Sequence, residues 1–201
     1  MSATDEAAPQ PEATVDQQIL IERAQRGDHD AFAELIDPAI ARLDAAARLI
    51  LRDRELARDA VQEATIRAWR DVRGLRDLER FDAWLYRLTV NACLDIARRR
   101  RRRVMEVTIE SLELPGQVDL AGDLVQRETV DAALSTLDPG HRAVVALHFL
   151  LDLPLREVAD VLGIPLGTAK SRLHYSLRTM RSGVIGDADS PRSVAPGGQV
   201  A

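Results

Sequence analysis

The 201-residue chain is 46% hydrophobic but only 3% aromatic, and its formal net charge is -5 at pH 7. This composition predicts aliphatic, mainly helical cores in one large or two small domains, because Ala, Leu, Arg and Glu all favour helices. The single cysteine, Cys93, excludes an intrachain disulfide framework and a cysteine zinc site. The sequence has no run of about 18 apolar residues, so no membrane span is expected.

The net charge hides an uneven distribution along the chain. Residues 1–15 are acidic and rich in Ala and Pro, and they are predicted to be disordered. They show neither a basic segment nor an apolar one, so we expect no signal peptide and a cytoplasmic location. Two basic bodies alternate with acidic connectors, and such local patches attract a polyanion whatever the net charge. The segment charges are -4 for 1–17, +4 for 18–103, -6 for 104–131, +2 for 132–183 and -1 for 184–201.

The first body, residues 16–103, is predicted to be a helical bundle. Two or three helices precede residue 52, with breaks near Gly27-Asp28 and Asp37-Pro38. Residues 54–72 then form a long helix whose apolar positions are Leu56, Ala60, Val61, Ala64, Ala68 and Val72. Residues 81–103 form another long helix with a buried stripe at Phe81, Trp84/Leu85, Leu88, Ala92 and Ile96.

Six consecutive arginines, 98–103, lie at the end of that second long helix. They are either a solubilising terminus that suits the helix dipole or a clamp for nucleic-acid phosphates. Phe81 and Trp84, next to an Arg-rich loop, are either core residues or platforms for an unpaired base. Stacking gives roughly 1–3 kcal/mol per base, whereas opening about ten base-pair steps costs on the order of 14 kcal/mol. The first body alone would therefore not keep a long stretch of DNA open, and it would need a larger protein complex that binds the rest of the separated strands.

Residues 104–124 are predicted to be a flexible acidic linker, residues 125–183 a second helical body and residues 184–201 a disordered tail. Within the second body, Asp138 is a candidate N-cap followed by Pro139 at the first helical position. A short helix over 155–162 is predicted to end at Gly163, and a turn leads to a second helix that starts near Thr168. This pattern specifies a helix-turn-helix, although a plain helical hairpin with a solvated basic face is the alternative.

The predicted second helix of that motif has two contrasting faces. Its inward positions follow helical spacing at Leu166, Ala169, Leu173, Leu177 and Met180. Its outward positions contain no acid, and they are rich in groups that donate to phosphates and base edges. Lys170 and Arg172 could read a guanine, and Thr168 and Ser171 could contact phosphate or base. His141 and His148 lack a third ligand nearby, so no metal is expected.

Taken together, these segments resemble the extracytoplasmic-function (ECF) group of sigma-70-type RNA polymerase sigma factors. The resemblance rests on "DAVQEATIRAWR" (59–70), "FDAWLYRLTVNACLDIARRRRR" (81–102) and "LREVADVLGIPLGTAKSRLHYSLRTMR" (155–181), and it runs from about residue 16 to residue 181. It departs at Ala64-Thr65-Ile66, where the family often has an aromatic or bulky residue after "VQE". It departs also at Gly140-His141, where an acid and Gln are frequent.

The resemblance implies an all-α fold of two small domains, sigma-2-like (16–103) and sigma-4-like (125–183), joined by the flexible linker. It implies contact with the β′ clamp helices of core RNA polymerase through Asp59, Gln62, Glu63, Arg67 and Trp69. It implies contact with the promoter −10 element in the region of Arg76, Arg80, Phe81, Trp84, Arg87, Asn91, Asp95 and Arg98. It implies contact with the −35 element through Thr168, Lys170, Ser171, Arg172, His174 and Arg178.

The expected function is therefore that of a sigma factor, which directs core polymerase to promoter DNA and helps to open it. It would use no cofactor or small-molecule substrate, and no membrane. The polymerase β flap is a further expected contact, and the sequence leaves open whether an anti-sigma protein, common in the family, binds. The alternative is a stand-alone helix-turn-helix regulator. An enzyme is disfavoured, because no nucleophile–base pair, phosphate loop or ligand cluster is evident. The acidic linker would cross the polymerase where nucleic acid would otherwise run, and its negative charge would mimic a polyanion there.

Overall fold

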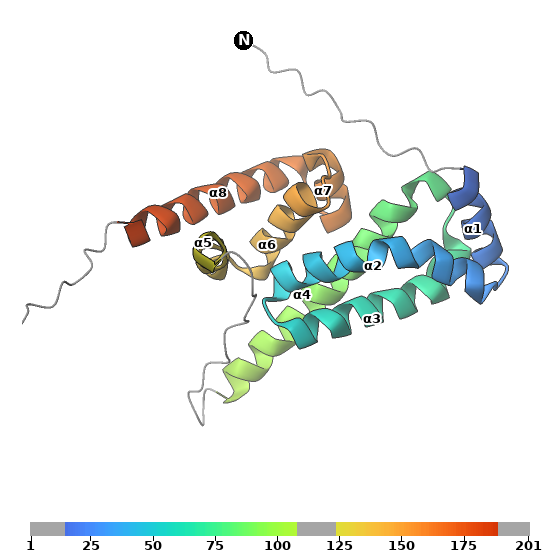
Figure 1. The fold of residues 1–201 in the computed structure, drawn as a ribbon, viewed down its shortest axis with the longest axis horizontal. Coiled ribbons are helices and arrows are strands. Elements are labelled where there is room, and N and C mark those ends of the chain that lie inside the picture. Colours follow the sequence, from blue (N-terminus) through green and yellow to red (C-terminus); the bar gives the residue numbers. More distant parts are fainter. Residues whose placement is uncertain (1–14, 108–123, 189–201) are drawn as a thin grey trace, which may run out of the picture.

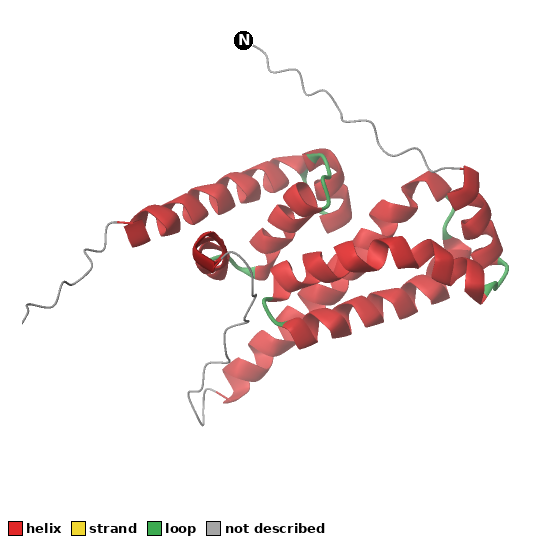
Figure 2. Ribbon diagram, in the orientation of Figure 1, coloured by secondary structure: helices red, strands yellow, loops and turns green. Residues whose placement is uncertain are grey.

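The computed structural model describes the backbone of residues 15–107 and 124–188, and the side chains of residues 16–103 and 130–182. Within these ranges every regular element is a helix (Figure 2), which confirms the predicted all-α fold. Most of the predicted linker and both predicted tails lie outside the described residues. Where they are described, residues 104–107 and 184–188 continue helices.

The first body is a bundle in which α1 and the paired helices α2, α3 and α4 surround an aliphatic core (Figure 1). Two short 3-10 turns, η1 and η2, carry the chain from α3 to α4. Gln25 anchors this connection, because its side-chain amide donates to the carbonyls of Val72 and Leu75 at 3.1 and 2.8 Å. The elements are α1 Val15–Gln25, α2 His29–Leu51, α3 Arg54–Asp71, η1 Val72–Gly74, η2 Leu78–Arg80 and α4 Phe81–Val107.

The predicted break at Asp37-Pro38 is wrong, since α2 runs unbroken through Pro38. A proline inside a helix costs roughly 3 kcal/mol, because it removes a hydrogen bond and crowds the preceding turn. Pro38 lies on the exposed side of α2, while Leu35, Ile36 and Ala39 beside it are buried. Burying these aliphatic side chains offsets the cost. The break at Gly27-Asp28 is confirmed, and Asp28 caps α2 by accepting from the backbone N–H groups of residues 30 and 31.

The second body packs a helix-turn-helix on a three-helix support. Asp138 caps α6 and Pro139 occupies its first position, both as predicted. The first motif helix matches the predicted bounds and ends at Gly163, which adopts the left-handed conformation with φ 63°. The next helix begins at residue 166, two residues before the predicted start near Thr168, and the Thr168 backbone N–H donates to the Pro165 carbonyl at 2.9 Å in its first turn. The elements are α5 Leu124–Ser135, α6 Pro139–Val145, the π-turn η3 Ala146–Leu150, α7 Leu155–Leu162 and α8 Leu166–Ala188.

The two bodies share one continuous hydrophobic core. Helix α6 lies against α2 and α4, and α7 lies against α4 (Figure 1). The core includes Ala46, Ala47 and Ile50 from α2 together with Val144 and Leu147 from the second body. The sequence predicted two domains and no particular packing between them, so this shared core is a property that only the folded structure shows.

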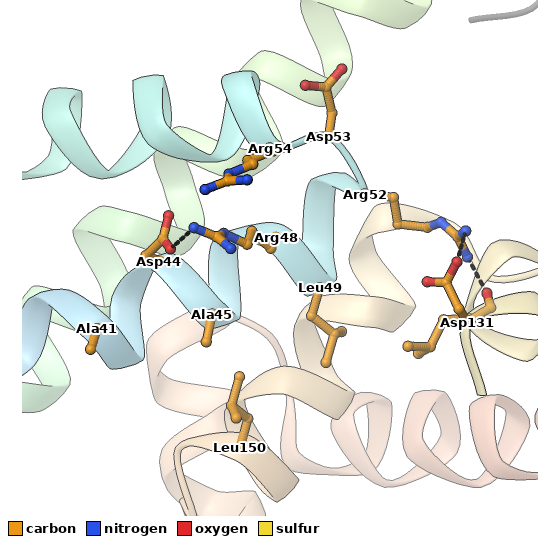
Figure 3. Close-up of a pocket in the computed structure, with 11 residues that line it drawn as sticks. Ala41, Asp44, Ala45, Arg48, Leu49, Arg52, Asp53, Arg54, Asp131 and Leu150 are labelled. Atoms are coloured by element: carbon orange, nitrogen blue, oxygen red, sulfur yellow. Dashed lines mark hydrogen bonds and ion pairs between the residues drawn. The ribbon is translucent and has the colours of Figure 1, made fainter. Parts of the chain in front are cut away.

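Polar contacts reinforce the junction at the C-terminal end of α2. Arg142, only 8% exposed, donates from Nε to the Ile50 carbonyl at 2.7 Å. Its Nη1 donates to the carbonyls of Leu137 and Leu134 at 2.5 and 3.4 Å. Burial, together with the positive charge of nearby Arg52, lowers the Arg142 pKa to about 10. Arg52 in turn pairs with the Asp131 carboxylate of α5 at 2.8 Å (Figure 3).

A cavity of ≈ 490 Å³ lies beside this junction, between α2, α5 and η3 (Figure 3). Its apolar wall comes from Ala41, Ala45 and Leu49 of α2 and from Leu134 and Leu150 of the second body. Ion pairs line its rim, including Arg48 with Asp44 at 2.5 Å. The two bodies therefore meet through a tightly packed core at α6 and more loosely at α5.

We predict that Arg142→Met lowers the free energy of unfolding by about 2–4 kcal/mol, because it leaves carbonyls of both bodies without their charged donor. Arg142→Lys keeps the charge but loses the planar fork, so it should recover only part of the loss. Urea denaturation followed by circular dichroism measures both variants. A loss below about 0.5 kcal/mol, the range of ordinary surface substitutions, would show that Arg142 is dispensable.

Candidate nucleic-acid and polymerase interfaces

The outward side of α8 forms the first candidate interface, here called the recognition face: Thr168, Lys170, Ser171, Arg172, His174 and Arg178. Lys170, Ser171, His174 and Arg178 are exposed, while Thr168 and Arg172 are half-buried. The opposite side holds buried Ala169 and Leu173, as the helical spacing predicted. The recognition face contains three permanent cations, Lys170, Arg172 and Arg178, and no acid, so its field suits a polyanion.

The N-terminus of α6 braces this face. The Asp138 carboxylate accepts from the His141 backbone N–H at 3.0 Å, and its other oxygen lies 2.6 Å from His141 Nδ1. The His141 ring lies 4.8 Å from the exposed Tyr175 ring on α8. The Arg172 side chain also lies beside the N-terminus of α6, because its Nη1 would be 3.7 Å from a Cβ atom placed on Gly140. This brace therefore directs part of the Arg172 guanidinium toward α6.

The outward side of α3 forms the second candidate interface, here called the clamp face: Asp59, Gln62, Glu63, Arg67 and Trp69. Asp59 and Gln62 are exposed, whereas Trp69 packs on His29 and Phe32 with ring centroids 4.1 and 5.1 Å apart. Ile66, which is not among the residues predicted from the sequence, is 45% exposed four residues after Gln62. Its signal in the sequence was an isoleucine outside the buried alanine pattern of α3. Large exposed aliphatic side chains of this kind mark candidate contact points.

An ionic chain connects the clamp face to α4. Arg67 pairs with Glu63 on its own helix and lies 3.8 Å from the Asp95 carboxylate of α4. Asp95 also pairs with Arg98 in the following turn. These arginines neutralise the one carboxylate of the predicted −10 residues on α4, so the acid does not repel a phosphate backbone there. Farther along, Arg100 pairs with Asp53, the cap of α3, at 3.3 Å.

The predicted −10 residues, here called the −10 set, follow one side of η2 and α4. Those that are exposed are Arg76, Arg80, Arg87, Asn91 and Arg98, while Trp84 and Asp95 are half-buried. Phe81 differs, because it is only 1% exposed and belongs to the shared core, 5.7 Å from the Trp84 ring. It presents no free face to a base, so we exclude it from the candidate surface and keep Trp84 as its aromatic platform.

The arginines 98–103 do not end α4, which continues to Val107. Five of them are exposed, and Arg100 is half-buried beside Asp53. Cys93 is fully buried nearby, and burial raises the pKa of its thiol to about 12. Among the described residues, no cluster of His, Cys, Asp and Glu is suited to a metal, and no helix is long and apolar enough to cross a membrane.

A basic helical bundle joined to a braced helix-turn-helix defines a two-part DNA-binding protein. Two family models match the chain: "Sigma-70 region 2" over residues 35–103 and "Sigma-70, region 4" over residues 133–182. Together with the relatives described next, these matches show that the chain belongs to the ECF group of the sigma-70 family of RNA polymerase sigma factors. This membership replaces the alternative interpretation of the chain as a stand-alone helix-turn-helix regulator.

Curated relatives and solved structures agree with this membership. The ECF RNA polymerase sigma factor SigW of Bacillus subtilis is 30% identical over 173 residues, which cover 80% of this chain and 92% of SigW. The ECF factor SigL of Mycobacterium tuberculosis is 36% identical over 64% of this chain and 75% of SigL. The solved structure of CnrH in complex with the cytosolic domain of CnrY is similar with a TM-score of 0.62, at 27% identity, over 87% of this chain and 99% of that one.

We predict that Asp138→Ala lowers the free energy of unfolding by about 1 kcal/mol at pH 7, because α6 loses its N-cap. Burial alone would raise the Asp138 pKa, but hydrogen bonds from the His141 backbone and ring lower it overall. A carboxyl group with a lowered pKa stabilises the fold above its unfolded pKa, and this contribution is lost as pH falls through the folded pKa.

The difference between wild type and Asp138→Ala should therefore stay constant near neutrality and shrink below about pH 4, which lies near the unfolded pKa of Asp. Urea denaturation at a series of pH values measures the difference. Asp138→Asn, which keeps an acceptor without the charge, is the matched control and should lose less at pH 7. A difference that grows on acidification would contradict the role assigned to the carboxylate.

Proposed function

We propose that this chain is the promoter-specificity subunit of an RNA polymerase. Its clamp face, with Ile66 added, binds the β′ clamp helices of the core enzyme, and its second body contacts the β flap. Its recognition face reads the −35 element, and its −10 set, without Phe81, holds the −10 element as the DNA opens. The chain acts in the cytoplasm by binding and catalyses no reaction of its own.

The observation that supports this proposal most is the separation of three largely solvent-facing surfaces around one shared core. The recognition face carries cations and no acid, which suits duplex DNA. The −10 set combines exposed arginines with a half-buried tryptophan, which suits an unpaired strand. The clamp face is mixed in charge and has an exposed isoleucine, which suits a protein rather than DNA.

The same division assigns the domains. Residues 16–103 would hold the polymerase and the −10 element, and residues 125–183 would hold the −35 element. We further infer that a protein partner, of the anti-sigma kind expected from the sequence, binds this chain, because the similar protein CnrH was solved in complex with the cytosolic domain of CnrY. Residues 104–124 remain assigned as an acidic connector.

Run-off transcription with purified core polymerase tests the function directly. We predict that the chain directs initiation at discrete sites on genomic fragments and that Ile66→Asp abolishes both this activity and co-elution with core. A buried interface centre costs about 2 kcal/mol or more when disrupted, which weakens binding at least thirtyfold. Ile40→Asp is the matched control, because Ile40 is also exposed (37%) but lies on α2. Equal core binding by both variants would remove Ile66 from the interface.

We predict that Lys170→Ala, tested in reconstituted holoenzyme, weakens binding to fragments selected from a genomic library. If Lys170 reads a base, the loss is about 1–3 kcal/mol and base preference relaxes at one position; if it holds a phosphate, the salt dependence falls by about one charge. Electrophoretic mobility shift at several salt concentrations distinguishes these cases. Arg26→Ala is the control, because Arg26 is exposed beside Glu22, far along the chain from α8. Unchanged affinity and salt dependence would exclude Lys170 from the DNA interface.

A further inference from the structure

The cavity between α2, α5 and η3 has the size and lining of a site for a small amphipathic molecule (Figure 3). Its volume of ≈ 490 Å³ lies within the range of roughly 300–1,000 Å³ that is typical of small-molecule pockets. Its apolar wall is partly open to solvent, because Leu150 is 39% exposed and Ala45 and Leu49 are half-buried. A ligand that covered these aliphatic side chains would remove apolar area from water, which favours binding.

The apolar wall is held in place by packing behind it. Leu134 is only 9% exposed and belongs to a small core cluster with Leu137 and Val145, and Leu49 of α2 packs against the same cluster. The wall is therefore formed before any ligand arrives. A preformed wall lowers the cost of binding, since few side chains have to be ordered.

The charged groups around the cavity leave one arginine over. Each lining carboxylate already pairs with an arginine: Asp44 with Arg48, Asp131 with Arg52 and Asp53 with Arg100. Arg54 also lines the cavity, and its exposed side chain makes no ion pair or hydrogen bond among the described residues. It is the first residue of α3, where a cation is unfavourable for the helix dipole. The rim therefore has one excess positive charge, which suits a monoanion.

Arg48 has a second unmet hydrogen-bonding group. Its Nη2 binds the Asp44 carboxylate at 2.5 Å, whereas its Nε is buried without a hydrogen-bond partner in the described part of the chain. A buried donor without an acceptor costs free energy, so Arg48 would gain from a further acceptor. Figure 3 shows the Arg54 side chain extending toward Arg48 and Asp44. An anion held by Arg54 would therefore arrive beside Arg48.

We propose that this cavity binds the anion of a medium-chain fatty acid. Its carboxylate accepts charge-assisted hydrogen bonds from Arg54 and Arg48, and its aliphatic chain covers Ala45, Leu49 and Leu150. A monoanion matches the single excess charge at the rim, whereas a phosphate dianion would bring more negative charge than the rim can neutralise. No residue of the recognition face, the clamp face or the −10 set lines this cavity, so the inference does not rest on the function proposed above.

Isothermal titration calorimetry of the full-length chain with sodium hexanoate and sodium octanoate tests the site. We expect one molecule per chain and an affinity that rises about fourfold for each methylene group that is buried. Octanol has the same chain without the charge and should bind at least about fivefold more weakly than octanoate. Octyltrimethylammonium, with the opposite charge, should not bind measurably. Absence of octanoate binding, or equal binding of octanoate and octanol, would overturn the proposal.

Two variants separate the charged end of the site from its apolar wall. Arg54→Gln should weaken octanoate binding about fivefold or more and leave octanol binding unchanged. Arg58→Gln is the matched control, because Arg58 is also exposed on α3, one turn farther along, and does not line the cavity. Ala45→Phe fills the space beside Leu150, so it should abolish binding of both ligands. Equal effects of Arg54→Gln and Arg58→Gln would exclude Arg54 as the carboxylate partner.

Urea denaturation checks that each variant is folded, and the exposed position of Arg54 keeps the test valid if Ala45→Phe is not. The other candidate occupant is the chain's own segment 108–123, which contains both acids and aliphatic side chains. Replacing that segment by Gly and Ser residues of equal number should change octanoate affinity less than about threefold. A larger gain would show that the segment fills the cavity in the intact chain, and it would overturn the site as one for a free ligand.

Discussion

The packing of α6 against α2 and α4 determines how the rest of the molecule is arranged. Ala46, Ala47 and Ala143 allow close approach because their side chains are small, and Ile50 and Val144 add apolar contact in the shared core. Arg142 extends from this contact to the last turn of α2 and satisfies a carbonyl there. Once α6 is fixed, the position of α7 over α4 and the outward direction of α8 follow.

The low aromatic content of the chain affects how closely its helices pack. The buried side of α3 is largely alanine, so a neighbouring helix can approach its backbone closely, whereas the buried side of α2 mixes alanines with larger aliphatic side chains. Arginine dominates that outside, and its planar donors pair with carboxylates such as Asp95 and Asp131 without leaving the surface. The same side chains remain available for phosphates, because exposed ion pairs are weak.

The three candidate surfaces differ in the chemistry that they offer to a partner. Surfaces suited to protein and to duplex DNA face solvent, and Arg80, Trp84 and Arg87, which suit an unpaired strand, line a cleft beside α7.

Local signals in the sequence determined most of the secondary structure and the family. Asp138 and Gly163 marked helix ends correctly, because a cap depends on a few neighbouring backbone groups. Apolar spacing likewise identified the inward sides of α3 and α8, and the outward sides then supplied most of the candidate residues.

Only the tertiary structure decided the features that depend on distant residues. Pro38 stayed inside α2 because its neighbours are buried, and Phe81 became a core residue because the bundle closes over it. Arg142 meets a carbonyl 92 residues away, and Asp160 meets an arginine 80 residues away. Periodicity along one helix cannot encode such pairings, because it specifies which side of a helix is buried but not which partner buries it.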